Sequence, residues 1–230
     1  MKLENDLQTD NWETSYSRKD NFIYYPKDEV VKFINRFVRK RNGIDLFTDI
    51  IGTGSVLKGL DLGCGIGRQT ILMEEFKMHG YGVDISAIAI KEAKSLARSF
   101  GYEMDSRFVV LTENSLPFKN DFFDFAISDS VLDSMYFKFA KTYIKELDRT
   151  VKKLVYLNLI SGESVKENFS EDVLVTTMHE EGTIQSYYNT EKINNLIEGT
   201  NWKVKQLNTM TECNLLSAAK RVRYHIVLSK

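Results

Sequence analysis

The sequence predicts an α/β fold, in which a mostly parallel, doubly wound sheet carries helices on both faces. Segments with strand patterns alternate with segments of helical spacing from residue 56 to residue 160. Such alternation places connecting helices on the faces of a parallel sheet. The first of these strands also runs into a glycine-rich turn that opens a helix, an arrangement typical of ligand-binding sheets of this class.

Two helices are expected before the sheet. Residues 3–18 form a polar helix, and the segment Tyr25-Pro26-Lys27-Asp28-Glu29 begins a second. An apolar stripe at helical spacing, which we interpret as packing against the sheet, is made of Val30, Val31, Phe33, Ile34, Phe37 and Val38.

The alternating region then supplies five strands and three helices. The strands are expected near 56–62, up to Asp84, and over Arg107–Leu111, Phe123–Ser128 and Lys153–Ile160. The helices are expected over Arg68–Lys77, Ala87–Phe100 and Met135–Thr150, the second of them ended by Gly101.

The alternation of strands and helices ends beyond Ile160. The segment Glu171–Tyr188 lacks a helical period, and Glu180-Glu181-Gly182 is a plausible turn between two strands of a hairpin. We interpret residues 161–190 as an insertion. A helix over Glu191–Glu198 and two closing strands, Trp202–Met210 and Arg223–Leu228, complete the prediction.

Composition favours one domain over residues 1–230. The chain has 230 residues, of which 43% are hydrophobic and 27% charged, enough for one sizeable core. The formal net charge is −1 with basic residues scattered among acidic ones, so nucleic acid is a poor candidate partner. The local basic runs Arg36–Arg41 and Lys220–Arg223 are interpreted as solvated faces or strand edges.

Membrane insertion, disulfides and metal are not expected. No apolar run is long enough to span a bilayer and the N-terminus lacks the apolar core of a signal peptide, which predicts a cytoplasmic protein. Cys64 and Cys213 fit no disulfide or zinc spacing and are interpreted as free thiols. Three histidines without clustered spacing predict no bound metal.

The segment Leu60-Asp61-Leu62-Gly63-Cys64-Gly65-Ile66-Gly67-Arg68 carries the clearest chemical signal. Its glycines allow positive φ angles and close approach of a ligand to the backbone. A dinucleotide fingerprint would need a glycine at position 68, where this chain has arginine. The carboxylate of Asp61 repels phosphate but can hold an ammonium group. The turn therefore predicts a site for a nucleotide that carries a cationic amino-acid group.

This segment closely resembles the first motif of class I S-adenosylmethionine-dependent methyltransferases. Two later segments resemble further motifs of that family in the right order: Tyr81–Ser86, with its acidic end at Asp84, and Ser115–Asp124. The chain departs from the family at Thr112, where an aspartate often meets the adenine. The resemblance covers residues 56–160 well and implies a Rossmann-like sheet of seven strands with the last strand antiparallel.

The resemblance also implies a cofactor site for S-adenosylmethionine and its product S-adenosylhomocysteine. The residues that would wrap the methionine part are Asp61, Gly63, Cys64, Gly65 and Gly67. Those that would hold or edge the ribose and adenine are Asp84, Ile85, Thr112, Glu113 and Asn114. Asp129 would lie beside the methyl group. Residues 1–45 would form a helical cap that brings Tyr16 and Tyr25 to the cofactor, although hydrophobic anchoring of these rings is an equal alternative.

Three side chains are candidates for a general base, which is needed only if the acceptor must lose a proton: Asp129, Asp133 and His179. Asp129 is equally a wall of the cofactor site. Asp133 stands where related enzymes often have histidine, and capping of the following helix is the favoured alternative. His179 lies in the insertion that should overhang the acceptor, although an exposed loop histidine is more often inert.

The absence of certain motifs excludes some classes of methyl acceptor. The fourth strand is followed by Ser128-Asp129-Ser130-Val131 and not by the motif of adenine or glutamine methylation, and no Pro-Cys nucleophile is present. The hypothesis is transfer of a methyl group to oxygen or nitrogen of a small polar metabolite, sugar or phosphorylated intermediate, by a monomer or homodimer. The alternative is a catalytically inactive regulatory or scaffold module that binds the cofactor, suggested by Thr112 and by the absence of Gly-Gly after Lys153.

Overall fold

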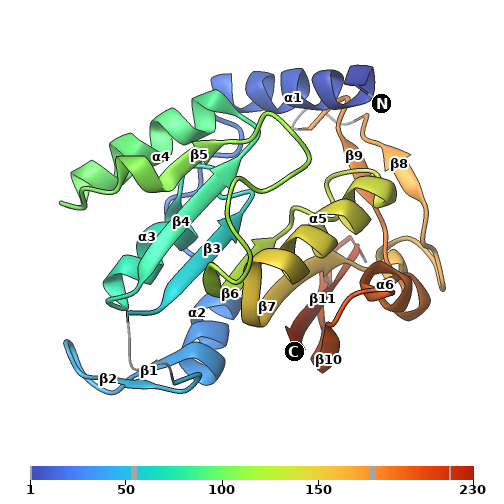
Figure 1. The fold of residues 1–230 in the computed structure, drawn as a ribbon. Coiled ribbons are helices and arrows are strands. Elements are labelled where there is room, and N and C mark those ends of the chain that lie inside the picture. The colour runs from blue at the N-terminus through green and yellow to red at the C-terminus, as the bar shows by residue number, and fades with distance from the viewer. Residues whose placement is uncertain (1, 53–55, 177–179, 218) are drawn as a thin grey trace.

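The protein is described by a computed structural model that covers residues 2–52, 56–176, 180–217 and 219–230. Its main feature is a seven-stranded sheet in the order β10-β11-β7-β6-β3-β4-β5 (Figure 1). The strands are β3 (Lys58–Leu62), β4 (His79–Asp84), β5 (Phe108–Val110), β6 (Phe123–Asp129), β7 (Val151–Ile160), β10 (Lys203–Cys213) and β11 (Lys220–Ser229). The neighbouring strands β7, β6, β3, β4 and β5 are parallel to one another, and β11 is antiparallel to both of its neighbours, β7 and β10. The predicted α/β fold and antiparallel last strand are confirmed.

Helices cover both faces of this sheet. One face carries α2 (Asp28–Phe33), which continues as a π-helical turn η1 (Ile34–Val38), with α3 (Arg68–Glu75) and α4 (Ala87–Ser99). The other face carries α5 (Phe137–Thr150) and α6 (Thr190–Ile197). The remaining helices are α1 (Lys2–Ser17) and two short 3-10 turns, η2 (Asp105–Arg107) and η3 (Gly162–Ser164). Figure 1 shows α1 lying across the end of the sheet toward which β3 and β4 point.

The predicted apolar stripe of α2 and η1 packs into the core. Val30, Phe33, Ile34 and Val38 are buried against side chains of α3 and of the central strands. Burying each large apolar side chain contributes about 1.5–3 kcal/mol to folding. Residues 28–38 therefore form part of the sheet's helical layer, and the segment that roofs the strand ends is α1.

The hairpin of β1 (Arg39–Arg41) and β2 (Phe47–Asp49) was not expected within a helical N-terminal region. Arg39 holds it in place, because its guanidinium donates to both carboxylate oxygens of Asp49, at 2.5 and 3.1 Å, and to the carbonyls of Phe76 and Lys77. Part of the basic run over residues 36–41 is therefore structural. The two strands of this hairpin are each three residues long, which is too short for an alternating sequence pattern to predict them.

The segment beyond β7 contains the predicted hairpin. Strand β8 (Asp172–Leu174) pairs antiparallel with β9 (Ile184–Ser186), and Gly182 has a φ of +85° in the turn region. The closing strands β10 and β11 extend further than expected, because their polar ends pair with each other past the last residue of β7.

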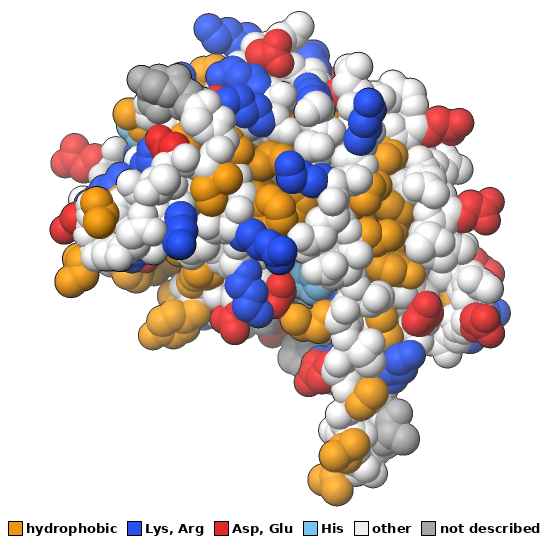
Figure 2. Space-filling view, turned by 90° about the horizontal axis from the view of Figure 1, so that it is seen from below, with side chains coloured by type: hydrophobic (Ala, Val, Ile, Leu, Met, Phe, Trp, Pro, Cys, Tyr) orange, Lys and Arg blue, Asp and Glu red, His pale blue; other side chains and the backbone are white. Residues whose placement is uncertain are grey.

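The surface carries both charge signs. Figure 2 shows a face on which basic and acidic side chains are interspersed with neutral and apolar ones. Among the residues that the structure describes, no helix is both long and apolar enough to cross a bilayer. The exclusion of nucleic acid as a partner stays a prediction.

Candidate active site

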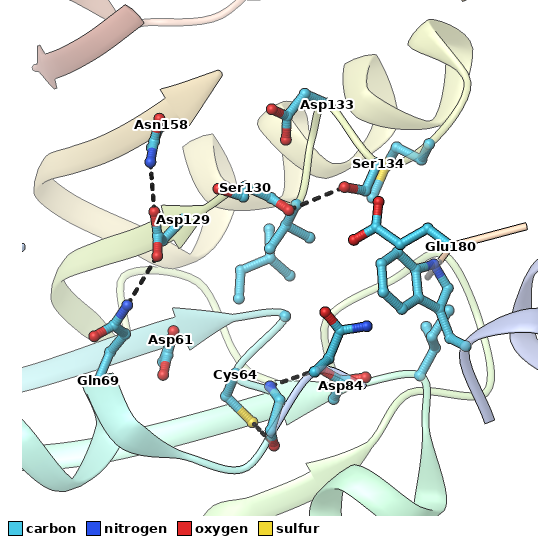
Figure 3. Close-up of a pocket in the computed structure, with 18 of the residues that line it drawn as sticks. Asp61, Cys64, Gln69, Asp84, Asp129, Ser130, Asp133, Ser134, Asn158 and Glu180 are labelled. Atoms are coloured by element: carbon cyan, nitrogen blue, oxygen red, sulfur yellow. Dashed lines mark hydrogen bonds between the residues drawn. The ribbon is translucent and has the colours of Figure 1, made fainter. Parts of the chain in front are cut away.

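A large cavity opens where the parallel strands end. Its volume is about 1580 Å³, beyond the roughly 300–1,000 Å³ of ordinary small-molecule pockets. Its walls come from the turn after β3, the ends of β4, β5 and β6, helix α1, the β8–β9 hairpin and β11 (Figure 3). The space can therefore hold a cofactor and a second molecule together.

The glycine turn after β3 brings backbone directly to this cavity. Gly63 and Gly65 have φ angles of +68° and +53°, which favour glycine. A Cβ on Gly63 would lie 2.4 Å from Val131, and one on Gly65 would lie 2.6 Å from the hydroxyl of Tyr16. No side chain larger than hydrogen fits at either position.

Gly67 lies where the turn enters α3. A Cβ there would lie 3.0 Å from Ala93 and Phe108. With its φ of +85°, this glycine lets α3 begin and lets α4 pack closely. It is not among the residues that line the cavity, and the expectation that it helps to wrap the cofactor stays a prediction.

Asp84 is the last residue of β4, and its carboxylate holds the glycine turn that follows the neighbouring strand β3. One carboxylate oxygen accepts the Gly65 N–H at 2.8 Å, and the other accepts the Ser86 N–H at 2.9 Å. Burial raises the pKa of Asp84, while these backbone bonds act in the opposite direction. Ile85, the next residue, also lines the cavity.

Asp61, at the end of β3, and Cys64, in the glycine turn, are both buried. Asp61 accepts a hydrogen bond from the Thr70 hydroxyl at 2.7 Å, and burial raises the pKa of Asp61 to about 7. Cys64 is a buried free thiol whose pKa burial also raises. Burial therefore disfavours the thiolate of Cys64, which is the nucleophilic form.

Helix α1 forms the roof of the cavity. The carboxylate of Glu13 accepts the backbone N–H groups of Ala87 and Ile88, at 2.6 and 3.2 Å, and the Ser86 hydroxyl, so that it caps α4. In the middle of α1, Gln8 and Asn11 donate to the carbonyl of Gly182. The helix therefore spans from α4 to the β8–β9 hairpin.

Replacing Glu13 by glutamine is expected to loosen this roof. A charged cap at a helix N-terminus contributes about 0.3–2 kcal/mol, which corresponds to dissociation of a bound ligand faster by about twofold to 30-fold. Stopped-flow dissociation of S-adenosylhomocysteine measures the effect. Glu198→Gln, at an exposed carboxylate 4.0 Å from Lys141, is the matched control. Equal dissociation rates in the two variants would show that α1 is not a roof.

The N-terminal aromatic residues divide into two groups. Tyr16 is buried against Ile66 and Ala89 and lines the cavity, as does Trp12. Tyr25 is 83% exposed and is not among the residues that line the cavity. Its backbone carbonyl accepts from Arg68, which does line the cavity, at 3.2 Å. A contact between the Tyr25 ring and the cofactor stays a prediction.

The loop after β5 reaches the cavity as expected. Thr112, Glu113 and Asn114 all line it, next to Val110 and Leu111 at the end of the strand. This places a polar edge beside an apolar one, the combination that an adenine ring requires.

A polar network surrounds Asp129 at the end of β6. Its carboxylate accepts from Lys27 at 3.1 Å, Asn158 at 2.7 Å, Gln69 at 2.9 Å and Arg68 at 3.4 Å. The side chain is 3% exposed. Both carboxylate oxygens are therefore engaged, each by two donors, and Asp129 holds these four side chains together.

Asp133 does not cap the helix that follows it. Helix α5 begins after Tyr136, and its first N–H group, that of Phe137, is accepted by Asp172 at 2.9 Å and not by Asp133. One oxygen of Asp133 instead accepts the Ile160 N–H at 2.7 Å and the Arg223 guanidinium at 2.6 Å. The capping interpretation is wrong, because the loop after β6 turns Asp133 toward β7 and β11.

Several residues of the site carried no readable signal in the sequence. They are Glu13, Lys27, Gln69, Asn158 and Arg223. Each is a single polar residue whose partner is distant along the chain, and the run that contains Arg223 resembles an ordinary strand edge. His179, the third predicted base, lies outside the residues that the structure describes.

The family of the chain follows from comparison with known proteins. The sequence model of a family described as a methyltransferase domain matches residues 54–212. The chain belongs to this family. The resemblance to class I S-adenosylmethionine-dependent methyltransferases is thereby confirmed, and S-adenosylmethionine is the cofactor of that class.

Solved structures share the fold at low sequence identity. An S-adenosylmethionine-dependent methyltransferase from Methanosarcina mazei is 20% identical with a TM-score of 0.63, covering 76% of this chain and 92% of that one. Magnesium protoporphyrin IX methyltransferase from Synechocystis, with bound S-adenosylmethionine, is 17% identical with a TM-score of 0.53 over 74% and 70% of the two chains.

A third structure with this fold is a [4+2]-cyclase, SpnF. It is 14% identical with a TM-score of 0.63, covering 90% of this chain and 86% of that chain. No curated protein matches the sequence. The fold alone therefore does not determine the reaction.

Proposed function

We propose that this protein transfers a methyl group from S-adenosylmethionine to an oxygen or nitrogen of a small polar metabolite. The observation that carries the proposal is the size of the cavity, about 1580 Å³, which can hold a cofactor and an acceptor together. In this proposal we call the part lined by the glycine turn, Asp61 and Asp84 the first compartment, and the part lined by Asp129, Asp133 and Arg223 the second compartment. We further propose that residues 1–230 act as one domain, with residues 161–190 as an insertion on the acceptor side.

The residues of the first compartment fit the cofactor. Gly63 and Gly65 form a cradle that a Cβ would fill. Asp84 has a carboxylate suited to accept hydrogen bonds from ribose hydroxyls, and Asp61 has one suited to an ammonium group. Ile85 and residues 112–114 would border the adenine.

When bound, the cofactor would supply an electrophilic methyl group: an acceptor lone pair would form the new bond to carbon while the electron pair of the carbon–sulfur bond would return to sulfur. The chain itself aligns the reactants and excludes water. The Asp129 network fixes the end of β6 beside the cradle, and α1 covers the site from above. Since Asp129 is engaged by four donors, we propose that it shapes the site without acting as the base.

The pKa of Asp61 gives this proposal a pH dependence. Because the pKa is raised to about 7, Asp61 is half protonated at neutral pH, and only its ionised form attracts an ammonium group. Affinity for S-adenosylhomocysteine is expected to fall about tenfold between about pH 7 and about pH 5.5. Calorimetric titration measures it. An Asp61→Asn variant should bind more weakly and show a flat profile, and a wild-type profile that is equally flat would contradict this role.

Turnover tests the proposed function itself. The protein is incubated with S-adenosylmethionine and a pool of small polar metabolites, and products are followed by mass spectrometry. We expect S-adenosylhomocysteine and one methylated metabolite in equal amounts, both lost in an Asp84→Ala variant. Tight cofactor binding without turnover across the pool would favour an inactive cofactor-binding module instead.

A further inference from the structure

The loop after β6 holds Asp133 in a fixed place beside the glycine turn. Ser130, the first residue of this loop, has a φ of +62°, which is unfavourable for a residue with a side chain. Its hydroxyl is held by Lys27 at 3.0 Å and Arg223 at 2.9 Å. Val131 packs directly over Gly63. The loop is therefore constrained where the two compartments of the cavity meet.

Asp133 presents an unused oxygen at this place. Its side chain is 4% exposed, and Arg223 and the Ile160 N–H occupy Oδ2. Within the described part of the chain, Oδ1 has no hydrogen-bond partner. Figure 3 shows Asp133 and Ser134 across the cavity from Asp84 and Cys64. A buried carboxylate oxygen without a donor is unfavourable, so a ligand that supplies a donor is favoured there.

A second oxygen that can only accept hydrogen bonds, Oε1 of Gln69, lies in the same cavity wall. The Gln69 side chain donates through Nε2 to Asp129 at 2.9 Å, which leaves its Oε1 facing away from that carboxylate. Oε1 is buried without a partner among the described residues, and Gln69 lines the cavity. Both oxygens can only accept, so both call for hydroxyl or amine donors from a ligand.

The charges around the cavity oppose an anionic ligand. Among the residues that the structure describes, eleven Asp and Glu residues line it, against five Lys and Arg residues. Three of those cations, Lys27, Arg68 and Arg223, already pair with Asp129 or Asp133. A phosphate group brings mainly acceptor oxygens and negative charge, so it can satisfy neither Oδ1 of Asp133 nor Oε1 of Gln69.

We propose that Asp133, positioned by Arg223, selects an acceptor that offers hydrogen-bond donors and carries no phosphate at this end. The acceptor class is an unphosphorylated polyol or amine, whose hydroxyl or ammonium group binds Oδ1 of Asp133. The proposal rests on the proposed function, because it takes the second compartment of the cavity as the acceptor site.

Paired probes test this selection on the full chain saturated with S-adenosylhomocysteine. The pairs are glucose and glucose 6-phosphate, glucosamine and glucosamine 6-phosphate, and ethanolamine and phosphoethanolamine. Saturation-transfer NMR measures binding of each. We expect at least one unphosphorylated member to bind and its phosphate ester to bind more weakly, with the sugar and the amine pairs distinguishing the two donor types.

Variants assign the effect to Asp133. Asp133→Asn is expected to weaken the bound probe at least about tenfold while leaving affinity for S-adenosylhomocysteine unchanged. Gln69→Met, which leaves the Asp133–Arg223 ion pair intact, should weaken the same probe by about threefold. Asp105→Asn is the matched control, since Asp105 pairs with Arg98 on the exposed surface outside the cavity.

Four results would overturn the proposal. If S-adenosylhomocysteine fails to bind the wild-type protein, the proposed function falls and this inference falls with it. If it binds, the inference alone is overturned by phosphate esters that bind as well as their parents, by unphosphorylated probes that all fail, or by probe affinity unchanged in both Asp133→Asn and Gln69→Met.

Discussion

Replacing Asp84 by alanine is expected to weaken binding of S-adenosylhomocysteine by about 100-fold or more. Each hydrogen bond to a charged acceptor contributes about 1.5–3 kcal/mol, and two ribose hydroxyls would lose their partner. Every 1.4 kcal/mol is about tenfold in affinity. The variant also frees the Gly65 N–H, which Asp84 accepts at 2.8 Å, so the glycine turn loses part of its support.

Calorimetric titration with S-adenosylhomocysteine measures this loss. Asp105→Ala is the control, because Asp105 pairs with Arg98 on the exposed surface. Thermal melting of both variants separates loss of binding from loss of folding. A folded Asp84→Ala variant with unchanged affinity would remove Asp84 from the cofactor site.

Replacing Asp129 by alanine is expected to lower the free energy of unfolding by about 2–3 kcal/mol. Removing one partner from a fully buried ion pair costs about 3–5 kcal/mol, and the loss is smaller here because the Lys27 side chain is 37% exposed. Lys27 and Arg68 would be left without their shared carboxylate. Asn158 and Gln69 would also lose the acceptor that holds them.

Urea unfolding at neutral pH measures this effect. Asp129→Asn, which keeps one acceptor oxygen, should lose less stability than Asp129→Ala. Asp105→Ala again serves as the surface control and should change stability by at most about 0.5 kcal/mol. A loss in Asp129→Ala no larger than in that control would mean that the network contributes nothing to folding.

The parts of the fold that the sequence predicted are those with a local pattern. The five alternating strands, the glycine turn and the apolar stripe of α2 each repeat a chemical character over several residues. The β1–β2 hairpin has no such pattern: its strands are three residues long and depend on Arg39, whose contacts at Phe76 and Lys77 lie far along the chain.

The residues of the site likewise fall into those with a local sequence pattern and those without one. Asp61, Gly63 and Asp84 lie at or next to recognisable strand ends, so their positions were predictable. The Asp129 network joins residues 27, 68, 69 and 158, which lie in three segments distant from Asp129 along the chain, and no local pattern links them. Asp133 was misread because its local position suits a helix cap, whereas its partner Arg223 lies 90 residues away.

A crystal structure of the complex with S-adenosylhomocysteine tests the central claim most directly. We expect the ribose hydroxyls on Asp84, the amino group near Asp61, and the sulfur facing the loop over residues 130–134. Density for the ligand outside this cavity, or in the cavity without a contact to Asp84, would contradict the account.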